Sequence, residues 1–326
     1  MHLMGMNNLE KTIAISCVPN LPFPVQLELL ASPLEINDIL AVDIFGFLGT
    51  STHRDKANGD FQSNRNRFEE FMRWLDVPRH HIVTIFDEQY PMLLRELDDP
   101  PLFLTYRGTL HSSNRFLSVV GTRTASERAL QAAFALGLEC ADWEVTTVSG
   151  FARGIDQAVH QGTLALQAPT WAVLGSGLAG IEALPRTLVE RFIDRGGTFL
   201  SEFHPLAAPL PWRFPIRNRI IAGISMATVI VQAPRRSGAL ITADHALRQG
   251  RDVLVHRSGL EGPAGAGSRI LCEAGAPVVE WLKEILEICG MEHENGRKAI
   301  RATADTDGER YRFGACHHVL SEHVTL

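Results

Sequence analysis

Short loops rich in glycine, serine, threonine and arginine follow several apolar segments of this 326-residue sequence. The backbone amides of small residues can approach an anion closely, and an arginine guanidinium can hold two phosphate oxygens at once. These loops contain Gly121-Thr122-Arg123, Ser149-Gly150, Ala152-Arg153-Gly154, Arg235-Arg236-Ser237-Gly238 and Thr242. Any one of them could be an ordinary turn, but their shared composition predicts a binding site for phosphate groups.

A basic segment with neighbouring aromatic side chains lies between residues 205 and 275. It carries nine arginines and four acidic residues, although the whole chain has a net charge of -6. Arg217, Asn218 and Arg219 form its densest point, and Trp212 and Phe214 precede them. This combination suits single-stranded nucleic acid, because phosphates pair with arginine while bases stack on aromatic rings. Alternatively, both aromatic residues belong to the hydrophobic core.

Two other patterns suggest different chemistry. Residues 175–180 have the outline of a dinucleotide-binding loop, but they follow the third predicted strand instead of the first, so we expect no cofactor. Glu202 and Asp244, with His245 or His256 nearby, could serve an enzyme that hydrolyses N-glycosidic bonds of nucleotides or DNA. For Asp244, the simpler interpretation is an acidic residue at the start of a helix, where the helix dipole stabilises it.

Composition and charge restrict the class of protein. Hydrophobic residues make up 45% of the chain and charged residues 21%, which is typical of a globular protein. The net charge excludes a surface that is positive throughout, but it allows a local basic groove. Five widely spaced cysteines without a Cys-x-x-Cys pair argue against a disulfide framework or a structural metal site. No uncharged apolar segment reaches the roughly 18 residues of a membrane helix, so we expect a cytoplasmic location.

Hydrophobic periodicity indicates which elements position these loops. Short apolar, β-branched segments alternate with amphipathic segments, which predicts an α/β domain with a Rossmann-like, doubly wound and mostly parallel sheet. Strands are expected near 116–121, 145–150, 170–177, 198–202, 227–233, 252–256 and 277–280, and helices near 126–142, 153–167, 186–195 and 241–249. Because the carboxyl ends of parallel strands share one edge of a sheet, the arginine-rich loops should meet there.

Three regions are predicted along the chain. Residues 1–80 form a small helical N-terminal region, with short helices on either side of Pro33 and a further helix near 66–75. Residues 81–285 form the Rossmann-like domain. Residues 286–326 lose the alternating pattern and form a polar C-terminal extension.

Longer strings of residues in the same part of the chain identify a protein family more specifically than the single loops do. They are Tyr90-Pro91, Asp99-Pro100-Pro101, Val120-Gly121-Thr122-Arg123, the stretch Ser149 to Asp156 (Ser-Gly-Phe-Ala-Arg-Gly-Ile-Asp), the stretch Phe214 to Gly223 (Phe-Pro-Ile-Arg-Asn-Arg-Ile-Ile-Ala-Gly) and the stretch Ser237 to Ala243. Together, and in this order, they resemble the DNA-processing protein A (DprA/Smf) family over about residues 88–280.

The resemblance implies a non-catalytic protein that binds single-stranded DNA in a positively charged pocket. Such proteins protect the strand, assist RecA loading in recombination and natural transformation, and form homodimers. The DNA- and phosphate-binding residues that the resemblance implies are Gly121, Thr122, Arg123, Ser149, Gly150, Arg153, Gly154, Arg217, Asn218, Arg219, Ser237, Gly238 and Thr242. Asp156, Asn218 and Glu202 would brace loops through hydrogen bonds, and His160 would be structural.

The sequence also departs from the family pattern. His256 and Arg257 stand at a strand end where the family commonly has a proline, which would place new polar groups at the edge of the pocket. Leu184 stands before Pro185 where a tyrosine is expected, and residues 286–326 are short for a winged helix. Two alternatives therefore stay open, namely the N-glycosidic hydrolase and a nucleotide-sensing module of a defence system.

Overall fold

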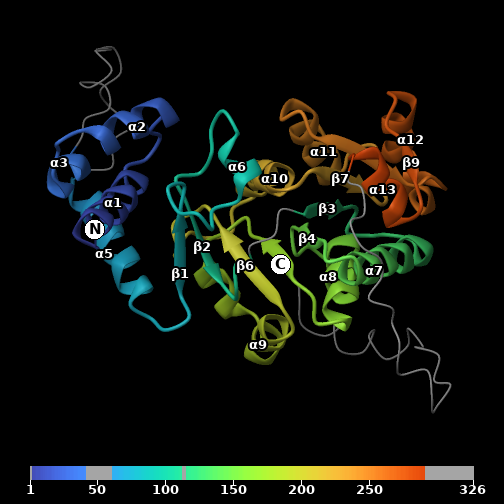
Figure 1. The fold of residues 1–326 in the computed structure, drawn as a ribbon, viewed down its shortest axis with the longest axis horizontal. Helices are drawn as coiled ribbons and strands as arrows, with labels where there is room; N and C mark the ends of the chain where they lie inside the picture. Colours follow the sequence, from blue (N-terminus) through green and yellow to red (C-terminus); the bar gives the residue numbers. More distant parts are fainter. Residues whose placement is uncertain (1, 42–60, 112–114, 291–326) are drawn as a thin grey trace.

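The computed structural model describes residues 2–41, 61–111 and 115–290 (Figure 1). They contain a sheet with helices on both faces and a helical region at its antiparallel edge. Most of the predicted C-terminal extension lies outside the described residues. No helix in the described ranges combines the length and the apolar character needed to cross a membrane.

The sheet has nine strands in the order β1-β2-β6-β5-β4-β3-β7-β8-β9. Their bounds are β1 (His81–Thr84), β2 (Phe103–Arg107), β3 (Phe116–Val120), β4 (Thr146–Ser149), β5 (Thr170–Val173), β6 (Gly197–Ser201), β7 (Ala227–Ile230), β8 (Asp252–His256) and β9 (Val278–Val279). All neighbours from β6 to β9 pair in parallel, while β2 pairs antiparallel with both β1 and β6. The seven predicted strands and the mostly parallel, Rossmann-like sheet are confirmed, and β1 and β2 were not predicted.

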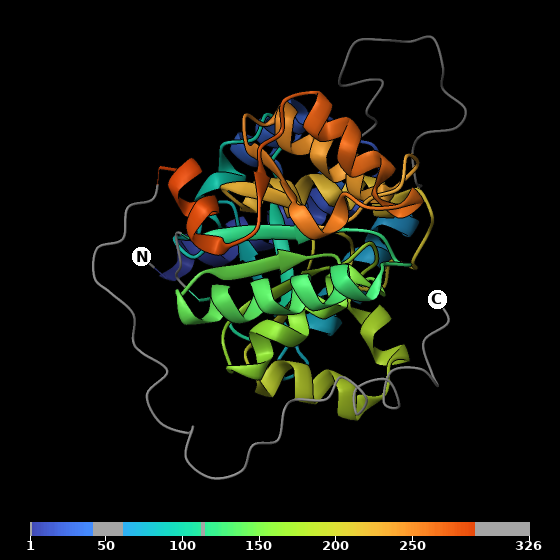
Figure 2. The same cartoon turned by 90° about the vertical axis from the view of Figure 1, so that its right-hand side faces the viewer.

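Two layers of helices cover the sheet. Their bounds are α6 (Met92–Arg95), α7 (Glu127–Asp142), α8 (Ile155–Ala165), α9 (Arg186–Asp194), α10 (Arg213–Ile224), α11 (Gly238–Arg248), α12 (Ala266–Glu273) and α13 (Leu282–Ile288), with short 3-10 helices η1 (Leu178–Ala183), η2 (Arg257–Gly259) and η3 (Pro263–Gly265). Figures 1 and 2 show the sheet between α10 and α11 on one side and α7 and α8 on the other.

The apolar character of the strands follows from this layering. Every residue of β3, β4, β5, β6 and β7 is buried. On one face, Ile220 of α10 and Ala243 of α11 belong to the core with Val120 and Ile230. On the other face, Leu136 of α7 and Val159 of α8 pack with neighbouring strand residues. A sheet enclosed on both faces excludes water from its strands, which explains their lack of polar alternation.

The N-terminal region consists of α1 (His2–Cys17), α2 (Phe23–Ala31), α3 (Ile36–Leu40) and α5 (Phe61–Leu75). As predicted, Pro33 lies between two short helices, whereas α1 was not predicted. These helices share one hydrophobic core with β1 and β2, in which the ring of Phe71 contacts that of Phe103 edge-on at 5.3 Å between centroids. The helical region is therefore anchored on the antiparallel edge of the sheet.

Candidate functional site

A cavity of about 310 Å³ opens beyond the carboxyl ends of β3 and β7. These two strands are neighbours, but the chain passes from β3 to β4 on the opposite side, so the strand order reverses between them. A doubly wound sheet leaves a crevice for ligands at such a point. The residues that line the cavity are Val120, Gly121, Thr122, Arg123, Ala152, Asp156, Phe214, Pro215, Arg217, Asn218, Ile221, Pro234, Arg236, Ser237, Gly238, Ala239, Ile241 and Thr242.

The amino ends of α10 and α11 both form part of the cavity wall. Phe214 and Arg217 come from the first turns of α10, and Gly238 and Thr242 come from α11. Ser237 is the N-cap of α11, and its hydroxyl accepts a hydrogen bond from the Ala239 amide at 3.2 Å. The unpaired amides of a helix start carry partial positive charge, so this wall favours a negatively charged ligand.

The predicted site residues divide into two groups. Those that line the cavity are Gly121, Thr122, Arg123, Arg217, Asn218, Ser237, Gly238 and Thr242. Those that do not are Ser149, Gly150, Arg153, Gly154 and Arg219. The common strand edge therefore brings together most, but not all, of the loops that the sequence singled out.

The cations of the cavity are of two kinds. Arg123 and Arg236 are exposed at its rim, and neither forms an ion pair with another described residue. Arg217 is only 5% exposed and belongs to the wall. Arg236 belongs to an arginine-rich loop but was not among the predicted site residues, and of the two adjacent arginines in that loop only Arg236 lines the cavity.

Arg217 ties three elements together around the cavity. Its Nη1 donates to the carbonyl oxygens of Gly150, at 3.1 Å, and of Val173, and its Nε donates to Asn218 Oδ1 at 3.2 Å. Asp156 Oδ2 accepts from the Gly150 amide at 3.1 Å. Burial lowers the pKa of Arg217 to about 10, so the guanidinium stays charged near neutral pH. Burial also raises the pKa of Asp156, although nearby Arg217 opposes that change.

Bracing of the loops by Asp156 and Asn218 is confirmed in the structure. Asn218 Nδ2 donates to the Gly238 carbonyl at 3.2 Å, which links α10 to the start of α11. Gly154 has a φ of 86°, and a Cβ there would lie 2.4 Å from the Thr122 carbonyl oxygen. A glycine is required at this position because the start of α8 approaches the loop that carries Arg123 so closely.

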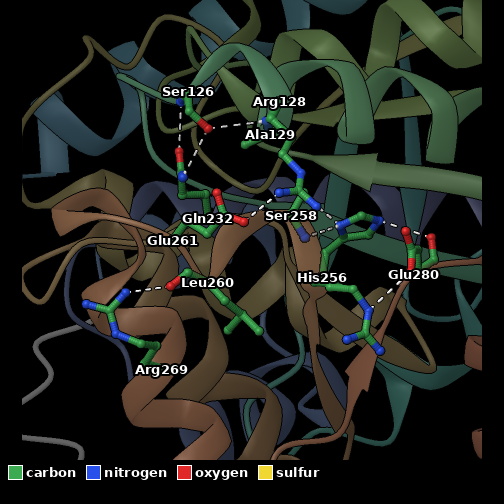
Figure 3. A network of polar contacts seen from close by, with 11 residues as sticks. Ser126, Arg128, Ala129, Gln232, His256, Ser258, Leu260, Glu261, Arg269 and Glu280 are labelled. Carbon is green, nitrogen blue, oxygen red and sulfur yellow. Dashed lines mark hydrogen bonds and ion pairs between the residues drawn. The ribbon is translucent and has the colours of Figure 1, made fainter.

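Gln232 joins the loops that follow β3 and β7. Its carbonyl accepts from the Thr122 amide at 2.8 Å. Its side chain accepts from the Ser126 amide at 2.8 Å and donates to the Ser126 hydroxyl at 3.2 Å (Figure 3). Ser126 in turn caps α7 by accepting from the Ala129 amide. One buried side chain therefore fixes the loop that holds Arg123 against the end of β7.

Arg219 lies outside the cavity and is engaged elsewhere. Its guanidinium forms an ion pair with Glu202, and its Nη1 donates to the Asp99 carbonyl at 2.8 Å. The side chains of Arg219 and Glu202 are only 16% and 10% exposed. Burial raises the pKa of Glu202, and the charge of Arg219 opposes this change. Arg219, which the sequence placed in the pocket, thus acts as the partner of a buried carboxylate that braces the loop after β6.

The residues proposed for hydrolysis are not assembled around the cavity. Asp244 pairs with Arg248 at 2.9 Å on the exposed side of α11. His256 is buried, accepts from the Ser258 amide at 3.1 Å and contacts the Glu280 carbonyl at 3.1 Å (Figure 3). Placing His256 and Arg257 at the pocket edge was wrong, because β8 is one strand further from β3 than β7 is.

The two aromatic residues before Arg217 are not core residues. Trp212 is 55% exposed, and Phe214 is partly buried in the cavity wall. The ring of Phe214 packs on Gly175, where a Cβ would come within 2.7 Å of it. The glycine string 175–180 thereby serves close packing and lies outside the cavity. Among the described residues, no cluster of three or more His, Cys, Asp or Glu side chains could hold a metal ion.

A larger cavity, of about 950 Å³, lies between α5, η1 and α9. It contains none of the predicted site residues. Two of its arginines, Arg79 and Arg107, are paired with the same carboxylate, Glu190, at 2.9 and 3.3 Å. Because Glu190 partly neutralises the positive charge of this cavity, it is less suited to bind a polyanion than the cavity between β3 and β7.

Sequence comparison relates the chain to a known protein family. A family model described as DNA recombination-mediator protein A matches residues 81–290. The chain is 38% identical over 227 residues to protein Smf of Escherichia coli (strain K12), covering 68% of this chain and 60% of that protein. It is 35% identical over 207 residues to DNA processing protein DprA of Streptococcus pneumoniae, covering 62% of this chain and 72% of that protein.

Solved structures show the same architecture. DNA processing protein A of S. pneumoniae superposes with a TM-score of 0.64 at 26% identity, covering 88% of this chain and 97% of that chain. DNA processing protein A of Helicobacter pylori, whose structure was solved to explain its single-stranded DNA binding mode, gives a TM-score of 0.56 at 23% identity, covering 64% and 95%. At 23% identity, the match to the H. pylori structure shows a similar fold and nothing more.

Proposed function

The chain belongs to the DNA recombination-mediator protein A family, and from this premise we propose that it binds single-stranded DNA at the cavity between β3 and β7. The chain spans only 60% of the length of E. coli protein Smf, so the activity of the whole protein is part of this proposal. The S. pneumoniae and H. pylori relatives are DNA processing proteins, and the H. pylori protein binds single-stranded DNA.

The observation that carries the proposal is the charge of the cavity. Arg123 and Arg236 are free of ion pairs within the described part of the chain, and Arg217 adds a buried positive charge behind them. The amino ends of α10 and α11 point to the same space. The arginine charges and the helix amino ends both favour the binding of phosphates. Phe214 adds a ring on which a base can stack.

Binding without catalysis fits the placement of the acidic groups. Glu202 is tied to Arg219, and Asp244 lies away from the cavity beside Arg248. Asp156 is the one acidic residue among those that line the cavity, and its carboxylate accepts from backbone amides of its own loop. A carboxylate occupied in this way is poorly placed to activate water or to stabilise a sugar cation.

A salt titration of Arg123→Ala tests the binding site. Each phosphate contact on a single strand contributes about 0.7 to the slope of log affinity against log salt. We expect Arg123→Ala to reduce that slope by about 0.7 and to weaken binding of all sequences alike. Arg195→Ala is the matched control, because Arg195 is also exposed and free of described ion pairs but lies at the end of α9. Equal slopes for the parent and Arg123→Ala would refute the site.

The finer role that the resemblance to this family implies is equally a proposal. We propose that the protein protects single-stranded DNA in transformation or recombination, assists RecA loading on it and acts as a homodimer. The functional unit is the domain over residues 81–285, and the cytoplasmic location expected from the sequence stays a prediction. RecA filament assembly on strands coated with single-strand binding protein, with and without this chain, measures the loading step.

A further inference from the structure

Trp212 is an exposed aromatic residue directly beside the candidate DNA site. It is the N-cap of α10, the helix whose first turns carry Phe214 and Arg217 into the cavity wall. More than half of its surface, 55%, is open to solvent. An indole of this size is normally buried, so its position next to a charged cavity suggests that it contacts a ligand.

The Trp212 ring is supported on one side by Arg213. The Arg213 guanidinium carbon lies 4.9 Å from the centroid of the Trp212 ring and 5.4 Å from that of Phe203. Its Nη1 also donates to the Ala208 carbonyl, which restricts its movement. A cation stacked between two rings holds the indole in a fixed orientation and leaves the rest of its surface accessible.

The backbone of a second arginine, Arg67 of α5, is tied to the loop that precedes α10. His204 Nδ1 accepts from the Leu206 amide at 3.2 Å, and its Nε2 then donates to the Arg67 carbonyl at 2.8 Å. This contact holds α5 against the loop that precedes α10. Burial lowers the pKa of Arg213, and the positive charge of Arg67 acts in the same direction.

Neither arginine is neutralised within the described part of the chain. No described ion pair includes Arg67 or Arg213, and Glu70 of α5, whose charge acts on His204, forms no described ion pair with either of them. The guanidinium of Arg213 on an exposed indole, with Arg67 on the helix tied to the same loop, matches one nucleotide of a single strand, because a phosphate needs a cation and a base needs an aromatic ring.

We propose that a single strand leaving the cavity continues toward α5, with an unpaired base stacked on Trp212 and the adjoining phosphate held by Arg213 and Arg67. The proposal rests on the proposed function and adds a second subsite to it. It makes the N-terminal region part of the DNA path. It also selects single strands, since a base within a duplex cannot stack on a protein ring without being unpaired.

The decisive experiment compares Trp212→Ala with Trp212→Phe on two polymers of equal length, oligo-dT and an abasic oligonucleotide. Loss of one base–aromatic stack corresponds to an affinity loss of about 5- to 150-fold. We expect that loss for Trp212→Ala on oligo-dT, substantial recovery in Trp212→Phe, and no change on the abasic strand. Trp281→Ala is the matched control, because Trp281 is also 55% exposed and caps a helix, α13, away from the cavity.

The outcomes distinguish the stacking subsite, the role of α5 in the DNA path and the proposed function itself. Unchanged affinity of Trp212→Ala for oligo-dT, or an equal loss on the abasic strand, overturns the stacking subsite. If Arg67→Ala leaves the salt slope unaltered, α5 does not belong to the DNA path. Failure of the parent protein to bind any single strand would instead overturn the proposed function itself, and circular dichroism of each variant confirms that it is folded.

Discussion

Breaking the ion pair between Glu202 and Arg219 tests whether these two residues have a structural role or take part in catalysis or DNA binding. Glu202→Gln keeps the shape of the side chain and removes its charge, which leaves the Arg219 guanidinium without its buried partner. Asp99 is the remaining acidic neighbour in the described structure, with 3.8 Å between Arg219 Nε and Asp99 Oδ2, but its side chain is 65% exposed. We therefore expect the pair to contribute to stability and not to ligand contact.

The expected loss of unfolding free energy follows from the burial of the ion pair. Removing one partner of a buried pair costs about 3–5 kcal/mol, and the exposed Asp99 can offset at most about 1 kcal/mol of this. A loss of about 3 kcal/mol lowers the melting temperature of a domain of about 200 residues by roughly 6–12 °C. Asp244→Asn, which breaks the exposed pair with Arg248, should cost under about 1 kcal/mol.

Urea unfolding measures the free energies, and a salt titration of DNA affinity is performed on the same variants below their unfolding midpoints. Glu202→Gln should lose stability while its salt slope equals that of the parent. The double variant Glu202→Leu with Arg219→Met should regain much of the stability, because apolar residues of similar volume can replace a buried pair. A Glu202→Gln variant with parental stability but abolished binding, or loss of a nucleobase-releasing activity in that variant, would refute this reasoning.

Two further predictions concern buried titration and the glycine at the start of α11. Burial lowers the pKa of His160 to about 3, below its usual value near 6.5, so between these pH values the unfolded chain gains a proton that the folded protein excludes. Stability should therefore fall with decreasing pH by up to about 1.4 kcal/mol per unit from this group, and less in His160→Phe, as urea unfolding from pH 7 to pH 4 will show. Gly238→Ala should leave stability nearly unchanged, because no atom lies within 4 Å of the added Cβ. It should nevertheless weaken DNA binding, measured by fluorescence anisotropy, if phosphates approach the amides of α11 closely, and unaltered affinity would count against that approach.

Much of the fold was predictable because the central strands are enclosed on both faces. Val119 and Val229 are buried in stretches with almost no polar residue, and such stretches are read easily from sequence. The strands β1 and β2 were not found, because each has residues that are only partly buried or exposed at one end, unlike the wholly buried central strands. The helix α1 also lacked a clear apolar stripe, since its residues mix polar and apolar types.

The site was predictable from topology to a similar extent. The carboxyl ends of parallel strands share an edge, so the loops with Arg123 and Ser237 were expected to meet, and both line the cavity. Arg217 and Arg219 could not be separated by sequence alone. Residues two apart on a helix point about 200° from each other, so one of them enters the cavity while the other meets Glu202.

The links that Arg217, Asn218 and Gln232 make among the surrounding loops have a thermodynamic consequence for ligand binding. A ligand that enters such a rigid receptor does not have to order the protein, so nearly all of the entropy lost on association belongs to the nucleic acid. Discrimination among strands then reflects how readily each one gives up its own self-stacking. Flexible pyrimidine tracts would then be held more tightly than stiff, stacked purine tracts.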